Sequence, residues 1–293
     1  MFAYDAVVGF FLDKRGLTHY NQGMDNFTIV TGACGGLGKA FCEELASGGN
    51  NLFITGTNLE RTKNWADELK AKHPEIKVEF CVCDLAKETD RENVFKVIKE
   101  KNLKVSRLIN NGGAIVEGAL LCFDNAQVLN AIRVNCEGTV DLTYKFLSEF
   151  KSDVEVLTVA SLGAFYPMPY MSLYSASKRM QVNLMLALRE EVKGKNIKIS
   201  TLCPGAIPTS DAMKKAIKSQ GLGGKLSSVE PQKIAKYSLK KLEKNKAIII
   251  PGAFNRMLKF FSCFVSERLV CKMVGKRWAK ANKKREGENG NGK

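Results

Sequence analysis

Short apolar runs rich in β-branched residues alternate along this chain with longer segments whose apolar residues recur at helical spacing. Seven strand-like runs are expected, from Phe27–Thr31 at the start to Ala247–Ile250 at the end, with helices between them. Parallel strands need such crossover connections, and the helices then cover both faces of one sheet. The pattern predicts an α/β fold with a Rossmann-type, doubly wound, parallel seven-stranded sheet. No linker or repeat interrupts the alternation, so 24–252 is expected to form one domain.

The composition excludes several classes of protein. Hydrophobic residues make up 45% of the 293 residues and charged residues 26%, which is ordinary for a globular domain rather than a disordered or collagen-like chain. Nine cysteines are too few for a disulfide scaffold, and two histidines, His19 and His73, favour neither a zinc site nor a Ser–His–Asp hydrolase. Reduced thiols and a cytoplasmic location are therefore predicted. The apolar runs are too short to span a bilayer.

Positive charge is concentrated near the end of the chain. The net charge is +15, and residues 232–293 contain seventeen Lys or Arg against four Asp or Glu. Within 253–281, apolar residues recur at helical spacing with basic residues between them, which predicts an amphipathic, basic helical segment. Peripheral contact with an anionic membrane is one interpretation, and cover for a pocket or a subunit interface is the other. Nucleic acid is not expected as a partner, because no reading motif accompanies the charge.

The two ends of the chain are set apart from the predicted domain. Residues 1–23 hold a short apolar stretch, Ala6–Leu12, without the features of a secretory signal. These residues are interpreted either as a loosely attached N-terminal arm or as residues that precede a native start at Met24. Residues 282–293, which are rich in Lys, Glu, Gly and Asn, are predicted to be disordered.

A glycine-rich segment, Thr31–Gly38, follows the first predicted strand and opens the first predicted helix. In that position glycine allows a tight turn, and backbone N–H groups at the helix start can approach a pyrophosphate. A plain turn between strand and helix is the alternative. The residues expected to contact a dinucleotide here are Thr31, Gly32, Gly36, Leu37 and Gly38.

The end of the second predicted strand bears on the choice between the two nicotinamide nucleotides. A carboxylate at that place binds the ribose 2′-hydroxyl of NAD and repels a 2′-phosphate, but the chain reads Gly56-Thr57-Asn58. NADP(H) is therefore favoured, and NAD(H) stays open. Asp84 follows the third predicted strand and is placed to accept a hydrogen bond from an adenine amino group. Its alternative role is to cap the next helix.

Tyr174 and Lys178 lie four residues apart in a predicted helix and therefore share one face. An ammonium beside a phenol is expected to lower the phenol pKa from about 10 toward neutral pH, which makes Tyr174 a candidate general acid or base. A solvated helix face is the alternative. Ser161 ends a predicted strand at the sheet edge where ligands bind. Asn135 lies inside a helix predicted over Asn125–Glu149, where it has either a functional role or a core hydrogen bond.

These residues together resemble the short-chain dehydrogenase/reductase family, in the branch with a TGxxxGxG cofactor loop. The resemblance covers Phe27–Ile250, and Asn110–Gly113 is similar to the family's NNAG motif with Gly112 in place of Ala. It implies an NAD(P)-binding catalytic domain over 24–252. The implied catalytic residues are Ser161, Tyr174, Lys178 and Asn135. The further cofactor contacts that it implies are Thr57, Asp84, Leu85, Asn111, Gly112, Tyr174, Lys178, Pro204, Gly205 and Thr209.

The resemblance is greatest to ketoacyl-type and hydroxysteroid-type reductases, and it implies a homo-oligomer, a dimer or a tetramer. It also implies hydride transfer between NAD(P)(H) and a carbonyl or secondary alcohol, with Tyr174 as general acid or base. In that mechanism Ser161 orients the oxygen, Lys178 lowers the tyrosine pKa and holds a nicotinamide ribose, and Asn135 supports a water that relays protons.

The segment between Ser161 and Tyr174 bears on the substrate. Gly163–Met171 is aromatic, contains methionine and carries no charge, which favours a lipophilic small molecule such as a ketoacyl chain or a steroid. The polar stretch Ser210–Ser228 is predicted to be a mobile lid over the substrate. A catalytically idle nucleotide sensor or membrane-attached scaffold with the same fold is the alternative function.

Overall fold

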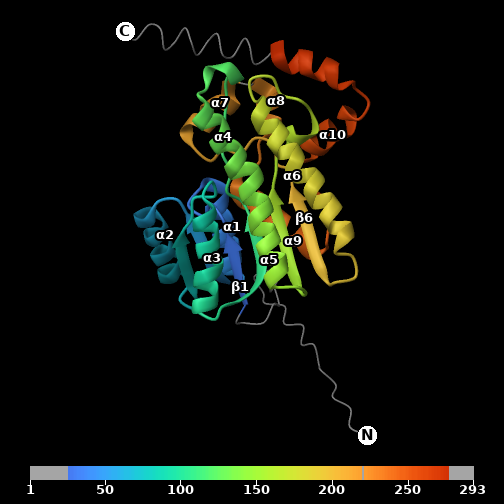
Figure 1. The fold of residues 1–293 in the computed structure, drawn as a ribbon. Helices are drawn as coiled ribbons and strands as arrows, with labels where there is room; N and C mark the ends of the chain where they lie inside the picture. The colour runs from blue at the N-terminus through green and yellow to red at the C-terminus, as the bar shows by residue number, and fades with distance from the viewer. Residues whose placement is uncertain (1–25, 220, 277–293) are drawn as a thin grey trace, which may run out of the picture.

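The computed structural model describes residues 26–219 and 221–276 (Figure 1). The predicted N-terminal arm, 1–23, and the predicted disordered tail, 282–293, lie outside the described residues. One sheet of parallel strands, in the order β3-β2-β1-β4-β5-β6-β7, runs through the molecule and confirms the predicted seven-stranded, doubly wound sheet. The strands are β1 Asn26–Val30, β2 Asn51–Gly56, β3 Val78–Val82, β4 Lys104–Asn110, β5 Val154–Val159, β6 Ile197–Leu202 and β7 Ile248–Ile249.

Helices cover both faces of this sheet. One face packs against α1 Gly36–Ser47, α2 Leu59–Lys72 and α9 Pro231–Glu243, and their buried residues form one core cluster with the strands. The other face packs against three helices that form a second cluster. These are α3 Glu88–Glu100, α5 Gly138–Glu149 and α6 Ser172–Glu191. Because both faces are covered, β2 and β5 are buried along their whole length, as strands of a parallel sheet usually are.

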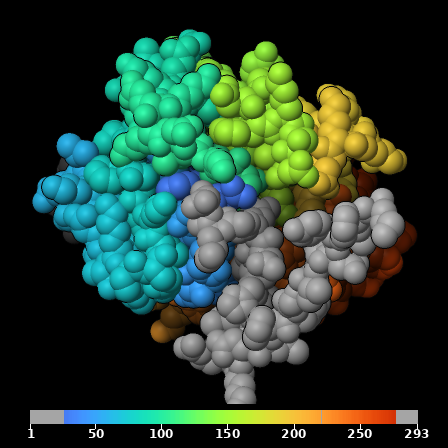
Figure 2. Space-filling view, turned by 90° about the horizontal axis from the view of Figure 1, so that it is seen from below, coloured from blue at the N-terminus to red at the C-terminus, as the bar shows by residue number. Residues whose placement is uncertain are grey.

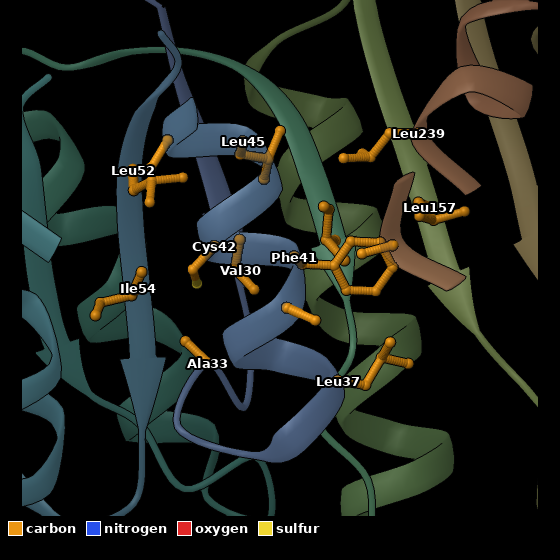
Figure 3. Packing of buried hydrophobic residues seen from close by; sticks show 14 of the residues in the cluster. Val30, Ala33, Leu37, Phe41, Cys42, Leu45, Leu52, Ile54, Leu157 and Leu239 are labelled. Atoms are coloured by element: carbon orange, nitrogen blue, oxygen red, sulfur yellow. The ribbon is translucent and has the colours of Figure 1, made fainter. Parts of the chain in front are cut away.

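Helix α1 shows how the apolar spacing of the sequence becomes packing. Leu37, Phe41 and Leu45 recur every four residues, so all three lie on the face of α1 that is turned toward the sheet (Figure 3). Phe41 and Leu45 are completely buried, and they share a core cluster with Leu157 of β5 and Leu239 of α9. This packing fixes the start of α1, and therefore the glycine-rich loop before it.

The single helix predicted over Asn125–Glu149 is wrong in its middle. Helix α4, Asn125–Ile132, is followed by a π-helical segment, Arg133–Glu137, before α5 begins. The carbonyl oxygen of Asn135 accepts hydrogen bonds from Thr139 Oγ1 at 2.9 Å and Gln181 Nε2 at 2.7 Å. These side-chain donors satisfy a carbonyl that a regular helix pairs with a backbone N–H, which accounts for the local widening.

The polar stretch predicted as a lid is also more ordered than a loop. It forms two helices, α7 Asp211–Ser219 and α8 Gly221–Ser227. Beyond β7 the chain continues into α10, Ala253–Ser262, and a further helix over 267–276. Figure 1 shows α7, α8, α10 and the red helix that follows gathered at one end of the molecule.

Figure 2 views the opposite end of the molecule, with residues near 60–105 in cyan and teal on one side and residues near 150 and 195 in lime and amber on the other.

Among residues 26–219 and 221–276, no helix is both long enough and apolar enough to cross a bilayer.

Candidate active site

The glycine-rich loop is tied to the end of β4, where the strand order reverses. Thr31 Oγ1 accepts hydrogen bonds from the backbone N–H of Asn111 at 3.0 Å and of Gly112 at 2.9 Å. In return, Asn111 Nδ2 donates to the carbonyl oxygens of Thr31 at 2.9 Å and Gly32 at 3.1 Å. Four residues predicted as cofactor contacts are thus brought together at the switch point of the sheet, which is where ligands of such folds bind.

The glycines of this loop are required by close packing. A Cβ on Gly38 would lie 2.2 Å from the carbonyl oxygen of Gly32, and a Cβ on Gly36 would lie 2.5 Å from Thr209 Cβ. Gly32 has a φ of 61°, in the left-handed region that favours glycine. Gly35 caps α1 without a side-chain hydrogen bond, so the first N–H groups of the helix face the loop. The side chain of Leu37 packs into the core, which leaves its backbone for a ligand contact.

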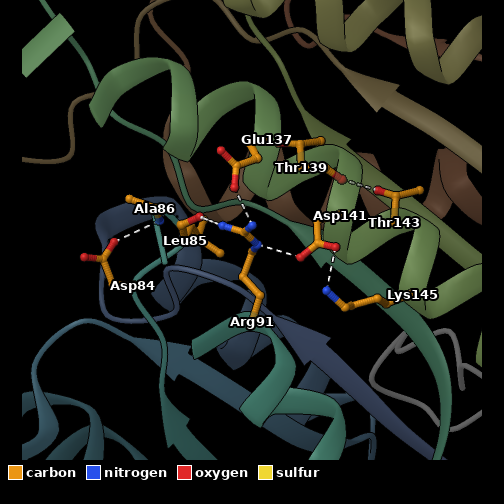
Figure 4. Close-up of polar contacts among 9 residues, drawn as sticks. All are labelled: Asp84, Leu85, Ala86, Arg91, Glu137, Thr139, Asp141, Thr143 and Lys145. Atoms are coloured by element: carbon orange, nitrogen blue, oxygen red, sulfur yellow. Dashed lines mark hydrogen bonds and ion pairs between the residues drawn. The ribbon is translucent and has the colours of Figure 1, made fainter. Parts of the chain in front are cut away.

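A buried arginine, Arg91, fixes the loop that follows β3 through a hydrogen bond. Arg91 of α3 donates to the carbonyl oxygen of Leu85 at 2.7 Å and forms ion pairs of 2.6 Å with Glu137 and Asp141 (Figure 4). Asp84 Oδ1 accepts from the backbone N–H of Ala86 at 3.0 Å. Lys87, not Asp84, occupies the N-cap position of α3 and makes no side-chain capping bond there, so the alternative role for Asp84 as that helix's cap is wrong.

Arg91 also connects the predicted adenine side with the catalytic side. Glu137 ends the π-helical segment that carries Asn135, and Arg91 binds Glu137 and Leu85 at once (Figure 4). The side chain of Leu85 lies against Gly112, where a Cβ would be 2.6 Å from Leu85 Cδ1. Leu85 is therefore packed against the chain that follows β4, and its contact with a cofactor stays a prediction.

A pocket of about 310 Å³ lies between α1 and α2 beside the glycine-rich loop. Its lining includes Asn58, the cations Lys39 and Arg61, and the acids Glu60 and Glu68, and Lys39 Nζ lies 3.9 Å from Glu68 Oε2. Arg61 Nη2 donates to the carbonyl oxygen of Cys34 within the loop at 2.8 Å. Thr57, the predicted contact at the end of β2, has an exposed side chain next to Asn58, which caps α2. Arg61, in the first turn of α2, brings a positive charge to the loop, and the sequence alone did not identify it as a site residue.

Ser161 and Tyr174 meet at the carboxyl end of β5. Their hydroxyl groups share a hydrogen bond, and Ser161 Oγ also accepts from the backbone N–H of Gly163 at 3.1 Å. Ser161 begins a short 3₁₀ segment, Leu162–Phe165, which turns the chain toward α6. The two hydroxyls that the sequence predicted to act on one oxygen atom are thus side by side.

Lys178 lies one turn after Tyr174 in α6 and is buried. Its Nζ donates to the carbonyl oxygen of Val159 at 2.8 Å and to Gln181 Oε1 at 3.0 Å. Removal of water from the ammonium disfavours its charged form and lowers the pKa of Lys178 from 10.5 to about 8. Its charge is therefore sensitive to pH in a range where an ordinary lysine stays protonated.

The expected lowering of the Tyr174 pKa by Lys178 is wrong for this structure. Burial raises the pKa of Tyr174, and the hydrogen bond from Ser161 offsets only part of that effect. Lys178 Nζ lies 5.9 Å from the centre of the tyrosine ring and directs hydrogen bonds to Val159 and Gln181. Loss of hydration at the phenol therefore outweighs the charge of the lysine.

Asn135 is buried, and its amide group links the β4 loop to α6. Its Oδ1 accepts from the backbone N–H of Ala114 at 2.8 Å, and its Nδ2 donates to Ala114 O at 2.8 Å and Ser177 Oγ at 3.1 Å. A Cβ on Gly113 would lie 3.2 Å from Asn135 Oδ1 and 3.4 Å from Lys178 Nζ. The four predicted catalytic residues are therefore neighbours around the ends of β4 and β5.

Two further residues of the site were not predicted from the sequence. Gln181 is buried and binds Lys178 Nζ, the Asn135 carbonyl and Thr139 Oγ1. Cys203, at the end of β6, is also buried, and burial raises its thiol pKa to about 12 despite the positive charge of nearby Lys178. Gln181 could have been found from its spacing, because it is seven residues after Tyr174 and shares its helix face.

The remaining predicted cofactor contacts, Pro204, Gly205 and Thr209, lie in the chain that follows β6. The carbonyl oxygen of Pro204 accepts from the backbone N–H of Leu162 at 2.8 Å, so Pro204 is held beside the 3₁₀ segment. Gly205 packs closely against α8, where a Cβ would lie 2.4 Å from Ser227 Oγ. Thr209 contacts the glycine-rich loop at Gly36, so the chain after β6 passes from the catalytic residues to the phosphate cradle.

A protein-family model described as short chain dehydrogenase matches residues 26–220. Human 17-beta-hydroxysteroid dehydrogenase type 3 is 31% identical over 195 residues, which are 64% of this chain and 61% of that protein. The very-long-chain 3-oxoacyl-CoA reductase of Pyricularia oryzae is 28% identical over 197 residues, which are 65% of this chain and 58% of that protein. The matched part of the chain is thus less than two thirds of the length of these two relatives.

Solved structures share the fold. A 7beta-hydroxysteroid dehydrogenase superposes with a TM-score of 0.75 at 20% identity, over 85% of this chain and 96% of that chain. An actinorhodin polyketide ketoreductase with NADPH gives 0.71 at 21% identity, over 79% and 97%. A short-chain dehydrogenase/reductase from Burkholderia phymatum in complex with NAD gives 0.66 at 21% identity, over 77% and 88%. With the family match across the sheet and this common fold, the chain belongs to the short-chain dehydrogenase family of oxidoreductases.

Proposed function

We propose that this protein transfers a hydride between NADP(H) and a carbonyl or secondary alcohol of a lipophilic substrate, with Tyr174 as the general acid or base. The observation that carries the proposal is the hydrogen bond between the Ser161 and Tyr174 hydroxyls, with buried Lys178 one turn further along α6. These groups lie at the sheet edge that also carries the glycine-rich loop, so one ligand can contact both.

The residues of the loop fit a dinucleotide. Side chains on Gly36 and Gly38 would collide with Thr209 and with the Gly32 carbonyl, so the glycines keep backbone N–H groups at the surface of the cradle. The start of α1 adds a positive electrostatic potential for a pyrophosphate. Lys39 and Arg61, in the adjoining pocket, are placed to bind the 2′-phosphate that distinguishes NADP(H).

When bound, a reduced nicotinamide supplies a hydride to the carbonyl carbon. Tyr174 donates a proton to the carbonyl oxygen as negative charge develops there, and the Ser161 hydroxyl donates a hydrogen bond to the same oxygen. Because burial raises its pKa, Tyr174 remains protonated at neutral pH and is suited to carbonyl reduction. Charged Lys178 offsets only part of the cost of the buried phenolate that is left after the proton transfer, because loss of hydration keeps the pKa of Tyr174 raised.

Asn135 and Gln181 hold the surroundings of Lys178 in place. Asn135 fixes the loop after β4 through both of its bonds to Ala114, and Gln181 accepts from the Lys178 ammonium. The relay of protons through a water beside Asn135, which the resemblance to the family implies, stays a prediction. Positioning of this kind contributes to the rate because it keeps the donor and the reacting oxygen in register.

A lipophilic substrate is supported by the segment between Ser161 and Tyr174. Phe165, Tyr166 and Met168 are partly buried there, and burial raises the pKa of Tyr166 to about 12, as an apolar environment does. Apolar side chains beside a few convergent hydroxyl groups are typical of sites that bind hydrophobic small molecules. The two curated relatives named above act, by their names, on hydroxysteroids and on very-long-chain 3-oxoacyl-CoA.

The proposal is tested by following the oxidation of NADPH and NADH in the presence of simple ketones, 3-oxoacyl thioesters and ketosteroids. Faster oxidation of NADPH with a lipophilic ketone than with a short polar ketone is the expected result. Nucleotide binding without oxidation by any member of the panel would contradict the proposal and support the idle sensor or scaffold.

A further inference from the structure

Helix α10 has apolar side chains on its exposed side as well as on the side that packs against the rest of the molecule, where Phe254 and Leu258 are partly buried. Asn255 is the one fully buried residue of this helix. Met257 is followed three and four residues later by Phe260 and Phe261, and Phe264 lies a further turn along; all four are exposed, with Phe264 at 73%. In a globular protein such a stripe normally faces the core, so this stripe is available to a partner outside the chain.

Other exposed apolar residues lie in segments that contact this region. Helix α8 exposes Leu222 and is joined to α10 by a hydrogen bond of 2.8 Å between Ser227 Oγ and Asn255 Oδ1. The helix over 267–276 exposes Leu269 and Met273. We call the exposed set the apolar rim: Leu121, Leu222, Phe260, Phe261, Phe264, Leu269 and Met273.

Two of the segments that carry the rim contact the chain between Ser161 and Tyr174. A Cβ on Gly275 would lie 3.3 Å from Pro169 Cγ, so the helix over 267–276 packs on one side of that segment. Gly118, three residues before Leu121, donates a hydrogen bond of 2.8 Å to the Tyr170 carbonyl, and Leu121 is 96% exposed. Figure 1 shows α7, α8, α10 and the red helix together at this end of the molecule.

The charge around the rim has one dominant sign. Within 211–219, 221–227 and 253–276 there are nine Lys or Arg and two acidic residues. One of the acidic residues, Asp211, is 3.3 Å from Lys214 in an ion pair. Three lysines, Lys214, Lys218 and Lys225, line a hollow of about 480 Å³ between α7 and α8, together with Leu222. Apolar side chains framed by cations match the interface of an anionic bilayer, where acyl chains lie beneath phosphate groups.

We propose that the apolar rim docks onto the surface of an anionic phospholipid bilayer and turns the Ser161–Tyr174 segment toward the lipid. Phe260, Phe261 and Phe264 enter the boundary between headgroups and acyl chains, and Arg268, Lys272 and Lys276 bind lipid phosphates. A lipophilic substrate dissolved in the bilayer then reaches the site without crossing water. Docking itself depends on the exposed surface and needs neither nucleotide nor turnover.

Sedimentation of the full chain with lipid vesicles tests the proposal. We expect binding to vesicles of phosphatidylcholine mixed with phosphatidylglycerol, much weaker binding to pure phosphatidylcholine, and loss of binding as salt is raised. Combined replacement of Phe260, Phe261 and Phe264 by Ser is expected to reduce the bound fraction at least tenfold. Combined replacement of Arg268, Lys272 and Lys276 by Gln is expected to abolish the preference for anionic lipid.

Leu59→Ser and Tyr144→Ser are the matched controls, because both side chains are exposed apolar groups on α2 and α5. These two variants are expected to bind vesicles like the wild type. Equal binding to both kinds of vesicle, or unchanged binding by the triple Ser variant, would overturn the proposal. So would a dimer in solution that the triple Ser variant dissociates while neither protein binds vesicles, since the rim would then be an interface between two copies. Vesicle binding is measured without substrate, so its failure is separate from failure of the proposed reaction.

Discussion

Lys178 and Gln181 share a hydrogen bond in the interior of the molecule, with Lys178 Nζ donating to Gln181 Oε1 at 3.0 Å. The same amide donates from Nε2 to the Asn135 carbonyl at 2.7 Å and to Thr139 Oγ1 at 2.9 Å. Gln181 therefore connects the ammonium to the π-helical segment on a neighbouring element. Through this amide, the position of the proposed catalytic lysine depends on the backbone around Asn135.

Replacement of Gln181 is expected to change the pH dependence of reduction as well as its rate. Gln181→Leu removes a hydrogen-bond acceptor from the ammonium, so the pKa of Lys178 falls. The alkaline limb of the pH–rate profile is then expected to move to lower pH. A net hydrogen bond of about 1 kcal/mol corresponds to a decrease in kcat of roughly fivefold to tenfold. Gln181→Glu places a carboxylate beside the ammonium and is expected to move the alkaline loss to higher pH. Identical pH–rate profiles for the three proteins would show that Gln181 only fills space.

The buried ammonium of Lys178 is expected to cost stability at neutral pH. Its pKa is about 8 in the folded protein and 10.5 as the ordinary value, so the unfolded chain binds more protons between these two pH values. The free energy of unfolding attributable to Lys178 therefore rises with pH through this window, by about 3 kcal/mol in total, and is lowest below pH 8. Denaturant unfolding of the wild type and Lys178→Met from pH 7 to pH 11 measures this difference, because Met lacks the titrating group. If the difference in the free energy of unfolding between the two proteins stays constant across that pH range, the lowered pKa of Lys178 is contradicted.

Two glycines in one loop are expected to differ sharply in their tolerance of alanine. A Cβ on Gly38 would be 2.2 Å from the Gly32 carbonyl oxygen, whereas a Cβ on Gly35 would be 3.4 Å from the same atom. Gly38→Ala is expected to destabilise the fold by at least about 2 kcal/mol and to prevent nucleotide binding, because the backbone must shift. Gly35→Ala is expected to stay within about 0.5 kcal/mol of the wild type. Thermal unfolding of both variants decides the matter, and equal melting temperatures would show that the loop relaxes without cost.

The choice of nucleotide is expected to depend on the two cations, Lys39 and Arg61, in the pocket between α1 and α2. Arg61→Gln and Lys39→Gln each remove a charge from that pocket and are expected to raise the KM for NADPH by about tenfold, as the loss of a charge-assisted hydrogen bond does. The KM for NADH is expected to change little, since NADH lacks the 2′-phosphate. Lys63→Gln is the control, because Lys63 is exposed on α2 outside the pocket lining. Equal increases in the KM for NADPH and the KM for NADH would show that these side chains do not bind the 2′-phosphate.

Much of the fold follows from local sequence patterns. The alternation of β-branched runs with helical spacing predicted the sheet, and the ends of its strands correctly placed Thr31, Asn111 and Ser161 along one edge. Such predictions succeed because a parallel sheet buried on both faces imposes both periodicities directly on the chain.

The features that sequence reasoning missed depend on contacts between distant segments. The π-helical segment forms where the side chains of Gln181, in α6, and Thr139 both donate to the Asn135 carbonyl in place of a backbone N–H. Helix propensity does not reflect these side-chain contacts. The pKa of Tyr174 depends on how completely the surrounding elements exclude water, which the four-residue spacing to Lys178 does not describe. Arg61, in the first turn of α2, reaches the carbonyl oxygen of Cys34 because its side chain is long.

The central claim is that Tyr174 transfers the proton. Tyr174→Phe removes only the hydroxyl, and Tyr144→Phe, at an exposed site on α5, is the matched control. The most direct measurement is single-turnover oxidation of NADPH by each protein with the most rapidly reduced ketone of the panel, alongside NADPH binding followed by fluorescence. The account predicts that Tyr174→Phe binds NADPH like the wild type and reduces the ketone at least about a hundredfold more slowly, with Tyr144→Phe unchanged. A rate for Tyr174→Phe within a few-fold of the wild type would contradict it.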